Sequence, residues 1–118
     1  MTKREFVADV LRQYTSLPHT PDQARKNDRH LAAELFDQKL PREIISAAFL
    51  IAIVRRAVRP ASEPPLDPIR SLAYFRPLIQ QLISNPVDDA HVDYITYRYQ
   101  QILADPESAT RVPQLPQV

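Results

Sequence analysis

The chain has 118 residues, a net charge of +1, 44% hydrophobic and 25% charged residues, values typical of one soluble globular domain. It has no cysteine, which excludes a disulfide framework, thiol catalysis and a zinc–thiolate site. It also has no glycine and twelve prolines, and the lack of glycine excludes the glycine-rich loops that hold nucleotide phosphates.

The first predicted helix covers about residues 3–16. Thr2 and Glu5 form the T-x-x-E pattern of a capping box, in which each side chain accepts a hydrogen bond from a backbone N–H group of the other residue. Apolar residues recur behind it at helical spacing and predict one buried face: Phe6, Val7, Val10, Leu11 and Tyr14.

A second helix is predicted over about residues 22–38, and the sequence leaves two possible positions for its start. Thr20 and Pro21 place a capping residue before a proline, which favours an early start, whereas Asn27 is a cap for a later one. An apolar stripe favours the later start for the packed part of the helix: Leu31, Ala32, Leu35 and Phe36.

The third predicted helix starts at Pro41 after a short turn. It ends in three arginines, Arg55, Arg56 and Arg59, whose charges complement the helix dipole. The run from Ala47 to Val54 is apolar on every side, a pattern typical of a helix that is buried all round. We therefore expect this helix to be the buried central element.

The C-terminal half reads as a stiff connector, two helices and a tail. Residues 60–67 are proline-rich, and Asp67 before Pro68 predicts a fourth helix that runs to about residue 84, with a kink or break caused by Pro77. Asp88 and Asp89 cap a last helix over about 89–104.

Together these elements predict an all-α fold. We expect a single orthogonal bundle of about five helices over residues 1–104, with a buried central third helix. Residues 105–118 hold three prolines and little periodicity, which predicts a flexible proline-rich C-terminal tail. The N-terminal residues show no signal-peptide pattern, and the longest apolar run is too short for a bilayer, so we expect a cytoplasmic protein without membrane contact.

Catalysis has little support in the residues. The three histidines form no metal-binding motif (His19, His30 and His91), and no serine lies in a nucleophile-elbow context. We therefore predict a protein that is not an enzyme, with no cofactor, no metal and no small-molecule substrate.

The charges are unevenly distributed along the chain. Residues 1–59 hold eleven lysines and arginines against seven acidic residues, whereas residues 60–118 hold four against seven. The basic residues are either solvated helix ends or, if two clusters converge, a surface for nucleic-acid phosphates. The candidate nucleic-acid-binding residues are Lys3, Arg4 and Arg12, then Arg25, Lys26 and Arg29, then Arg55, Arg56 and Arg59.

Aromatic residues supply candidate protein contacts. Tyr94, Tyr97 and Tyr99 cannot all point the same way on one helix. If Tyr99 faces the core, an exposed tyrosine lies beside Arg98, which is either a binding hot spot or an amphipathic edge of the core. The candidate protein-binding residues are Tyr74, Phe75, Tyr94, Tyr97 and Arg98, and the expected kink at Pro77 is a second place for a partner surface.

Residues 28–84 carry a resemblance to a known group of proteins. Its elements are the DRHLA stretch at residues 28–32, Leu35–Phe36, Leu40–Pro41, the long apolar helix to Arg55–Arg56, and PIRSLAYFRPLI at residues 68–79. These resemble small helical proteins encoded beside bacterial mobile elements, and are distantly similar to C-terminal helical regions of plasmid and phage replication initiators. The resemblance implies an accessory role in a prokaryotic DNA transaction and transfers no catalytic residue.

Two functional hypotheses follow. The first is a non-enzymatic accessory protein of replication or mobilisation, with basic clusters on DNA or RNA phosphates and the acidic C-terminal half and tail on a protein partner. The second is a pure protein–protein interaction or oligomerisation module without nucleic-acid contact.

Overall fold

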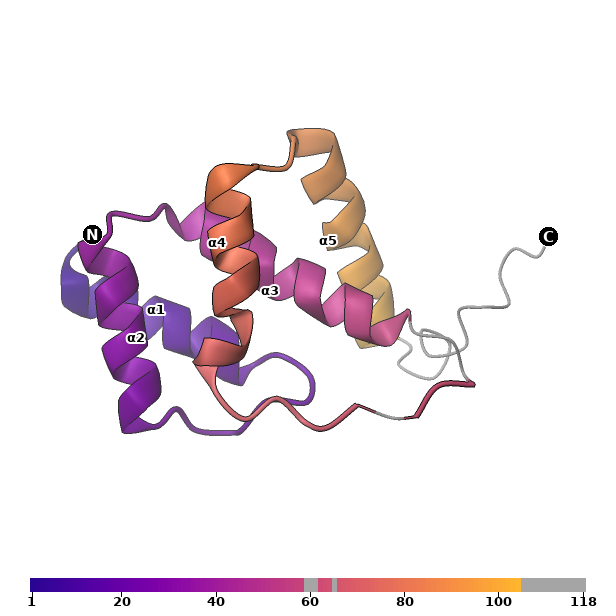
Figure 1. The fold of residues 1–118 in the computed structure, drawn as a ribbon, viewed down its shortest axis with the longest axis horizontal. Coiled ribbons are helices and arrows are strands. Elements are labelled where there is room, and N and C mark those ends of the chain that lie inside the picture. The colour runs from indigo at the N-terminus through magenta and orange to yellow at the C-terminus, as the bar shows by residue number, and fades with distance from the viewer. Residues whose placement is uncertain (59–61, 65, 105–118) are drawn as a thin grey trace. The chain divides into compact units, whose positions relative to one another are not determined.

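The computed structural model describes residues 1–58, 62–64 and 66–104 (Figure 1). The predicted tail over 105–118 and Arg59 lie outside these residues. Within them all regular structure is helical, which confirms the all-α class. The elements are α1 (Lys3–Thr15), α2 (Lys26–Asp37), α3 (Arg42–Ala57), the 3-10 helix η1 (Leu72–Phe75), α4 (Arg76–Ser84) and α5 (Asp89–Ala104).

The capping box at the start of α1 is confirmed. The Thr2 N–H donates to Glu5 Oε1 over 2.9 Å, and the Glu5 N–H donates to Thr2 Oγ1 over 3.2 Å. The bond from the Thr2 backbone favours the ionised carboxylate, and so it lowers the pKa of Glu5.

The second helix starts at Lys26, between the two starts left open near residues 22 and 28. Asn27 is exposed and is not the cap; the residue after it, Asp28, accepts a hydrogen bond from the Arg25 N–H at Oδ2 over 2.9 Å. Pro21 therefore lies in the loop before α2 and not in its first turn.

The end of α2 shows how a chain without glycine closes a helix. Lys39 has a φ of 61°, in the left-handed region that glycine usually occupies at this position. The Lys39 N–H donates to the Phe36 carbonyl over 2.8 Å, and the Leu40 N–H donates to the Leu35 carbonyl over 3.3 Å. These two bonds form a Schellman motif with a lysine in the glycine position.

The fourth predicted helix is wrong in its first third. Residues 66–71 form no helix, and the chain passes through η1 before α4 starts at Arg76. The reason is tertiary, because the Leu72 N–H, which would bond to the Pro68 carbonyl in a helix starting at Pro68, donates instead to Asp28 Oδ1 over 2.9 Å. The Ile69 N–H is held as well, by the His19 carbonyl over 2.8 Å. Of the two alternatives at Pro77, the break is confirmed, because η1 ends at Phe75 and α4 starts at Arg76. Pro77 lies in the first turn of α4, where a missing N–H costs no intrahelical bond.

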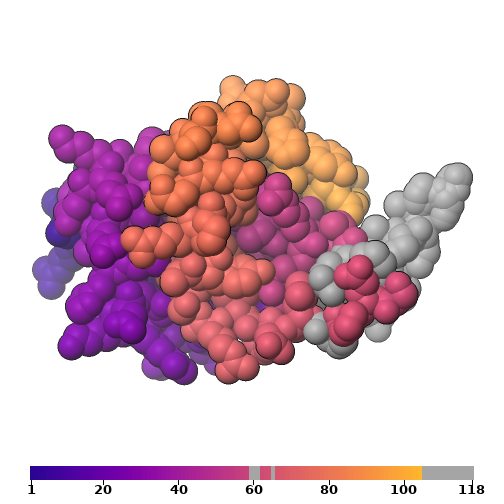
Figure 2. All heavy atoms as spheres, in the orientation of Figure 1, coloured from indigo at the N-terminus to yellow at the C-terminus, as the bar shows by residue number. Residues whose placement is uncertain are grey.

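The chain forms two compact units. The first unit combines residues 1–49 with 68–86, and the second combines residues 50–67 with the chain from Val87 onward. In the first unit α1 packs against α2, and η1 contacts both α2 and α4. Figure 2 shows the atoms of residues 68–86 lying directly against those of α2 as one continuous surface.

The core of the first unit is aromatic at its centre. The Phe75 ring packs edge-to-face on Phe49, with ring centroids 4.8 Å apart, and on Tyr14, at 6.2 Å. Aliphatic side chains surround these rings. The buried ones include Val10, Leu17, Leu31, Leu35, Ile45, Ile69, Leu72, Ile79 and Leu82.

Polar contacts join α1 to the first half of α3. Arg42 Nη1 donates to Asp9 Oδ2 over 2.6 Å, and Ser46 Oγ donates to Gln13 Oε1 over 2.8 Å. The bond from Arg42 is the main reason that the pKa of Asp9 is lowered, with smaller help from Gln13 and Arg12.

The second half of α3 belongs to the second unit. Ile51, Ala52, Ile53 and Val54 are buried there, as are Ile95 and Ile102 of α5. The expectation that α3 is the central element of one bundle stays a prediction. In the part of the chain that the structure covers, no helix combines the length and apolar character needed to cross a membrane.

Candidate functional site

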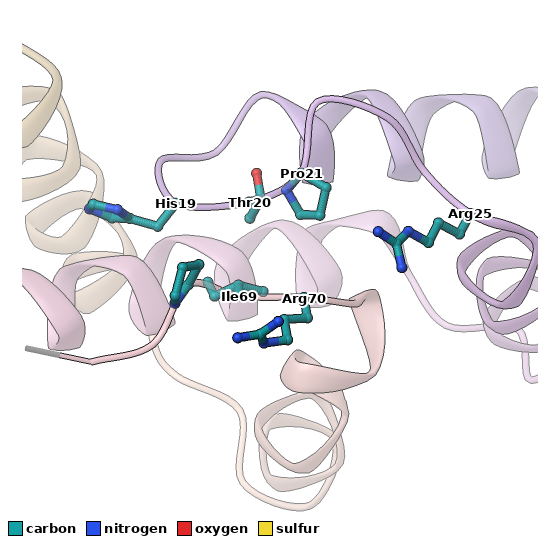
Figure 3. Close-up of a pocket in the computed structure, with 7 residues that line it drawn as sticks. His19, Thr20, Pro21, Arg25, Ile69 and Arg70 are labelled. Atoms are coloured by element: carbon teal, nitrogen blue, oxygen red, sulfur yellow. The ribbon is translucent and has the colours of Figure 1, made fainter.

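The first unit contains a pocket of about 400 Å³ between two segments that are far apart in the sequence (Figure 3). One wall comes from the loop between α1 and α2, and the other comes from the extended segment before η1. The lining residues are His19, Thr20, Pro21, Arg25, Pro68, Ile69 and Arg70.

Hydrogen bonds hold the first wall in place. The loop reverses at His19, whose φ of 66° lies in the left-handed region. Thr20 Oγ1 lies 2.9 Å from the Tyr14 carbonyl and 2.7 Å from the Leu17 carbonyl, so its hydroxyl fastens the loop to the end of α1. The bond from the Ile69 N–H to the His19 carbonyl then ties this wall to the second one.

Asp28 is the second anchor of the pocket. It is the charged residue of the core, with 3% of its surface exposed. Oδ2 accepts from the Arg25 N–H and Oδ1 accepts from the Leu72 N–H, both over 2.9 Å. One carboxylate therefore fixes the backbone next to both pocket arginines, Arg25 directly and Arg70 through the start of η1.

The pocket is lined by positive charge. Arg25 and Arg70 are exposed, and His19 is a third basic side chain. Among the described residues no acidic side chain lines the pocket, and neither arginine forms an ion pair. Two unneutralised guanidinium groups with five N–H donors each make this recess suited to an anion.

Four other basic residues of the first unit are paired with carboxylates, whereas Arg4, Lys26, Arg29 and Lys39 form no ion pair within the described residues. Lys3 lies 3.0 Å from Asp37. Arg12 and Arg42 both contact Asp9, and Arg76 contacts Glu34 over 3.1 Å. The pocket arginines differ from these in having no such neighbour to neutralise them.

The buried Tyr14 lies close enough to the Asp28 charge to be affected by it. Burial, followed by the Asp28 charge, raises the pKa of Tyr14 to about 12. Its hydroxyl has no hydrogen-bond partner within the part of the chain described here. A phenol with this pKa stays protonated at neutral pH, and so it is no base for catalysis.

The predicted basic clusters do not all converge. Arg25, Lys26 and Arg29 gather at the start of α2, beside the pocket. Lys3 pairs with Asp37 at the other end of this helix, roughly 16 Å away at 1.5 Å per residue. The structure instead brings the Arg25 cluster together with Arg70, which the sequence analysis did not select.

The third basic cluster belongs to the second unit. Arg55 is exposed, and Arg56 Nη2 donates to the Asp67 carbonyl over 2.8 Å. Their role in nucleic-acid binding stays a prediction.

Among the predicted protein-binding residues, the prediction for Phe75 is wrong. It is fully buried, because the three-residue period of η1 places Phe75 on the same side as Leu72, inside the core. Tyr74 lies outside and is exposed. On α5, Tyr94 and Tyr97 are 56% and 57% exposed, as expected.

Neighbouring polar groups order the exposed face of α5. Gln101 Nε2 donates to the Tyr97 hydroxyl over 3.0 Å, and Arg98 Nη1 donates to Gln101 Oε1 over 3.2 Å. Tyr99 is half-buried, and burial raises its pKa. The expectation that at least one of Tyr94 and Tyr97 is exposed if Tyr99 faces the core is therefore confirmed, since both are exposed.

Of the seven pocket residues, only Arg25 was among the predicted site residues, and the other six were missed: His19, Thr20, Pro21, Pro68, Ile69 and Arg70. No local pattern marks them, since the pocket exists only where the loop after α1 meets the segment before η1. The described residues contain no group of three or more histidine or acidic side chains arranged to hold a metal ion. Comparison of the chain with family models, curated proteins and solved structures finds no match.

Proposed function

We propose that this is a non-enzymatic, cytoplasmic nucleic-acid-binding protein that acts as an accessory in a prokaryotic DNA transaction, such as replication or mobilisation of a mobile element. The observation that carries the nucleic-acid part is the pairing of Arg25 and Arg70 in one pocket without a carboxylate. The accessory role rests on the resemblance of residues 28–84.

The charge distribution supports nucleic-acid binding by a local cluster of basic side chains. The net charge of the chain is only +1, so attraction to a polyanion must come from where the cations gather. Lys26 and Arg29 are exposed next to Arg25 at the start of α2, and Arg70 faces the same pocket. Two arginines therefore line the recess, and two more basic side chains are exposed in the first turns of α2.

A mobility-shift titration at two salt concentrations tests this proposal. Each neutralised phosphate releases counterions, so log K falls with log salt by about 0.7 to 0.9 per phosphate. We expect binding at low salt that weakens as salt rises. No binding at low salt, or binding that salt leaves unchanged, contradicts the proposal.

The exposed face of α5 favours a second candidate, a protein-interaction module. Tyr94 and Tyr97 are both more than half exposed, and tyrosine is enriched at binding hot spots. Light scattering of the wild type and of the Tyr94→Ser/Tyr97→Ser variant tests it. Self-association that the double substitution abolishes supports a module built on α5, and a monomer in both cases contradicts oligomerisation through this face.

The proposal also includes the fold expectation that the structure leaves open. In it, α3 is the hydrophobic axis of a five-helix domain over residues 1–104. The substitutions of Phe49 and Ile53 discussed below test this part.

A further inference from the structure

We propose that the pocket of the first unit receives one unpaired nucleotide of a single-stranded nucleic acid. Arg25 and Arg70 hold its phosphate, while the imidazole of His19 and the flanking proline rings contact its base. This inference rests on the proposed nucleic-acid function and adds to it the form of the strand and the residues that contact it.

The arginines account for the phosphate. A guanidinium group presents its N–H donors in a planar fork that matches two phosphate oxygens. Figure 3 shows the Arg25 side chain reaching back from the start of α2 toward the segment that carries Arg70. Because neither arginine is paired with a carboxylate in the described chain, binding a phosphate breaks no existing ion pair.

The other lining residues account for a base. Pro21, Pro68 and Ile69 give the pocket apolar walls, which suit the face of a nucleobase rather than a bare inorganic ion. His19 lies at the opposite end of the pocket from Arg25 (Figure 3), and histidine is among the side chains on which unstacked bases stack. Arg25 and His19 therefore lie at opposite ends of the pocket, with Arg70 between them (Figure 3).

The size and form of the pocket favour an unpaired nucleotide. Its volume of about 400 Å³ lies at the lower end of the range of about 300–1,000 Å³ for small-ligand pockets. A base reaches into such a recess only when it is out of the helical stack, which costs a few kcal/mol in a duplex and much less in a single strand. A pocket that receives a base therefore binds a single strand more tightly than a duplex.

Both walls are ordered before a ligand arrives. The Ile69–His19 bond joins them, and Asp28 fixes the backbone at Arg25 and Leu72. A preformed site loses little conformational entropy on binding, so modest contacts to one nucleotide suffice.

Fluorescence anisotropy with the full chain tests the proposal. The probes are a labelled single-stranded oligonucleotide, the duplex of the same sequence, and a free nucleoside monophosphate as competitor. The variants are Arg25→Ala, Arg70→Ala and His19→Asn, where asparagine tolerates the left-handed backbone. Lys39→Gly is the matched control, because it removes one positive charge beyond the other end of α2, away from the pocket.

We expect each pocket variant to weaken single-strand binding by at least about fivefold relative to Lys39→Gly, the lower bound for losing one base contact. In the wild type the duplex should bind more weakly than the single strand, and the pocket variants should weaken duplex binding less than they weaken single-strand binding. The nucleoside monophosphate should compete only weakly, because it lacks the contacts that the rest of a strand makes outside the pocket.

The failures are distinguishable. If the wild type binds no nucleic acid at low salt, the proposed function fails and the pocket proposal with it. If it binds but the pocket variants match Lys39→Gly, only the pocket proposal is overturned. If the variants lose equal affinity for single strand and duplex, the claim that the pocket takes an unpaired nucleotide is wrong. If the monophosphate competes as strongly as the strand, the ligand is a free nucleotide, and the claim that the pocket binds a strand is wrong.

A measurement on the wild type guards against unfolded variants. Amide chemical shifts recorded during titration with the single strand should change most at His19, Arg25 and Arg70. Changes that avoid these residues overturn the proposal independently of any substitution.

Discussion

The Ile69 N–H donates a hydrogen bond to the His19 carbonyl over 2.8 Å, and this bond joins the two walls of the basic pocket. It links a loop that follows the first helix to a segment that precedes η1. The bond holds the segment before η1 against the loop after α1, and so it explains why the pocket exists.

Replacing Asp28 with alanine should destabilise the first unit. The substitution leaves the buried Leu72 N–H without an acceptor, which costs about 1–3 kcal/mol for an unsatisfied buried donor. It also removes the acceptor for the Arg25 N–H. Urea unfolding measures the loss. Asn27→Ala is the control, because Asn27 is exposed and caps no helix, and an equal effect of both substitutions contradicts the anchoring role.

Replacing Tyr14 with phenylalanine should leave stability at neutral pH unchanged or slightly increased. The variant keeps the buried ring and removes a hydroxyl that has no partner among the described residues. A loss of more than about 1 kcal/mol in the unfolding free energy contradicts this, since it shows that the hydroxyl is bonded in solution.

The same variant should change the alkaline limit of stability. The pKa of Tyr14 is raised to about 12 in the folded protein, whereas an unfolded tyrosine titrates near 10. Between these values the unfolded chain releases the proton more readily, so the Tyr14 contribution is full below about pH 10 and is lost as pH rises toward about 12. As pH rises over this range, the thermal midpoint of Tyr14→Phe should fall less steeply than that of the wild type. Parallel profiles of the two proteins would contradict the raised pKa of Tyr14.

Phe49→Ala and Ile53→Ala should each lower the free energy of unfolding by about 2–5 kcal/mol, as other large-to-small changes at buried sites do. Both side chains are almost fully buried on α3. The control is Leu103→Ala on the exposed side of α5, which should change stability by no more than about 0.5 kcal/mol. A melting midpoint that either α3 substitution leaves unchanged contradicts the burial of this helix.

Replacing Lys39 with glycine should stabilise the protein. A residue with a side chain costs about 1–2 kcal/mol in the left-handed region, and glycine avoids this cost while losing some backbone entropy. We expect a net gain of up to about 1 kcal/mol in chemical unfolding. Lys39→Ala keeps the unfavourable backbone and should show no such gain, and a gain of the same size would instead point to the lost charge.

Local signals predicted the helices well. The capping box of Thr2 and Glu5 and the exposed tyrosines of α5 both depend on residues within one or two turns. Periodicity and capping describe such neighbours completely, and so the sequence alone was sufficient.

Long-range contacts explain the misses. Asp28 is the neighbour of the expected cap Asn27, but its partner Leu72 lies 44 residues away, and nothing in either segment signals the bond. The buried position of Phe75 depends on η1, because a 3-10 turn directs residues three apart to one side and no pattern in the sequence predicts this turn. The pocket itself needs His19 and Arg70 from separate segments, which no local pattern brings together.

Mapping the amide chemical shifts of the full-length protein during titration with a single-stranded oligonucleotide tests the central claim most directly. The claim predicts that the largest changes cluster at residues 19–25 and 68–70 and shrink as salt is added. Changes centred on the exposed face of α5, or an unchanged spectrum at low salt, would contradict it.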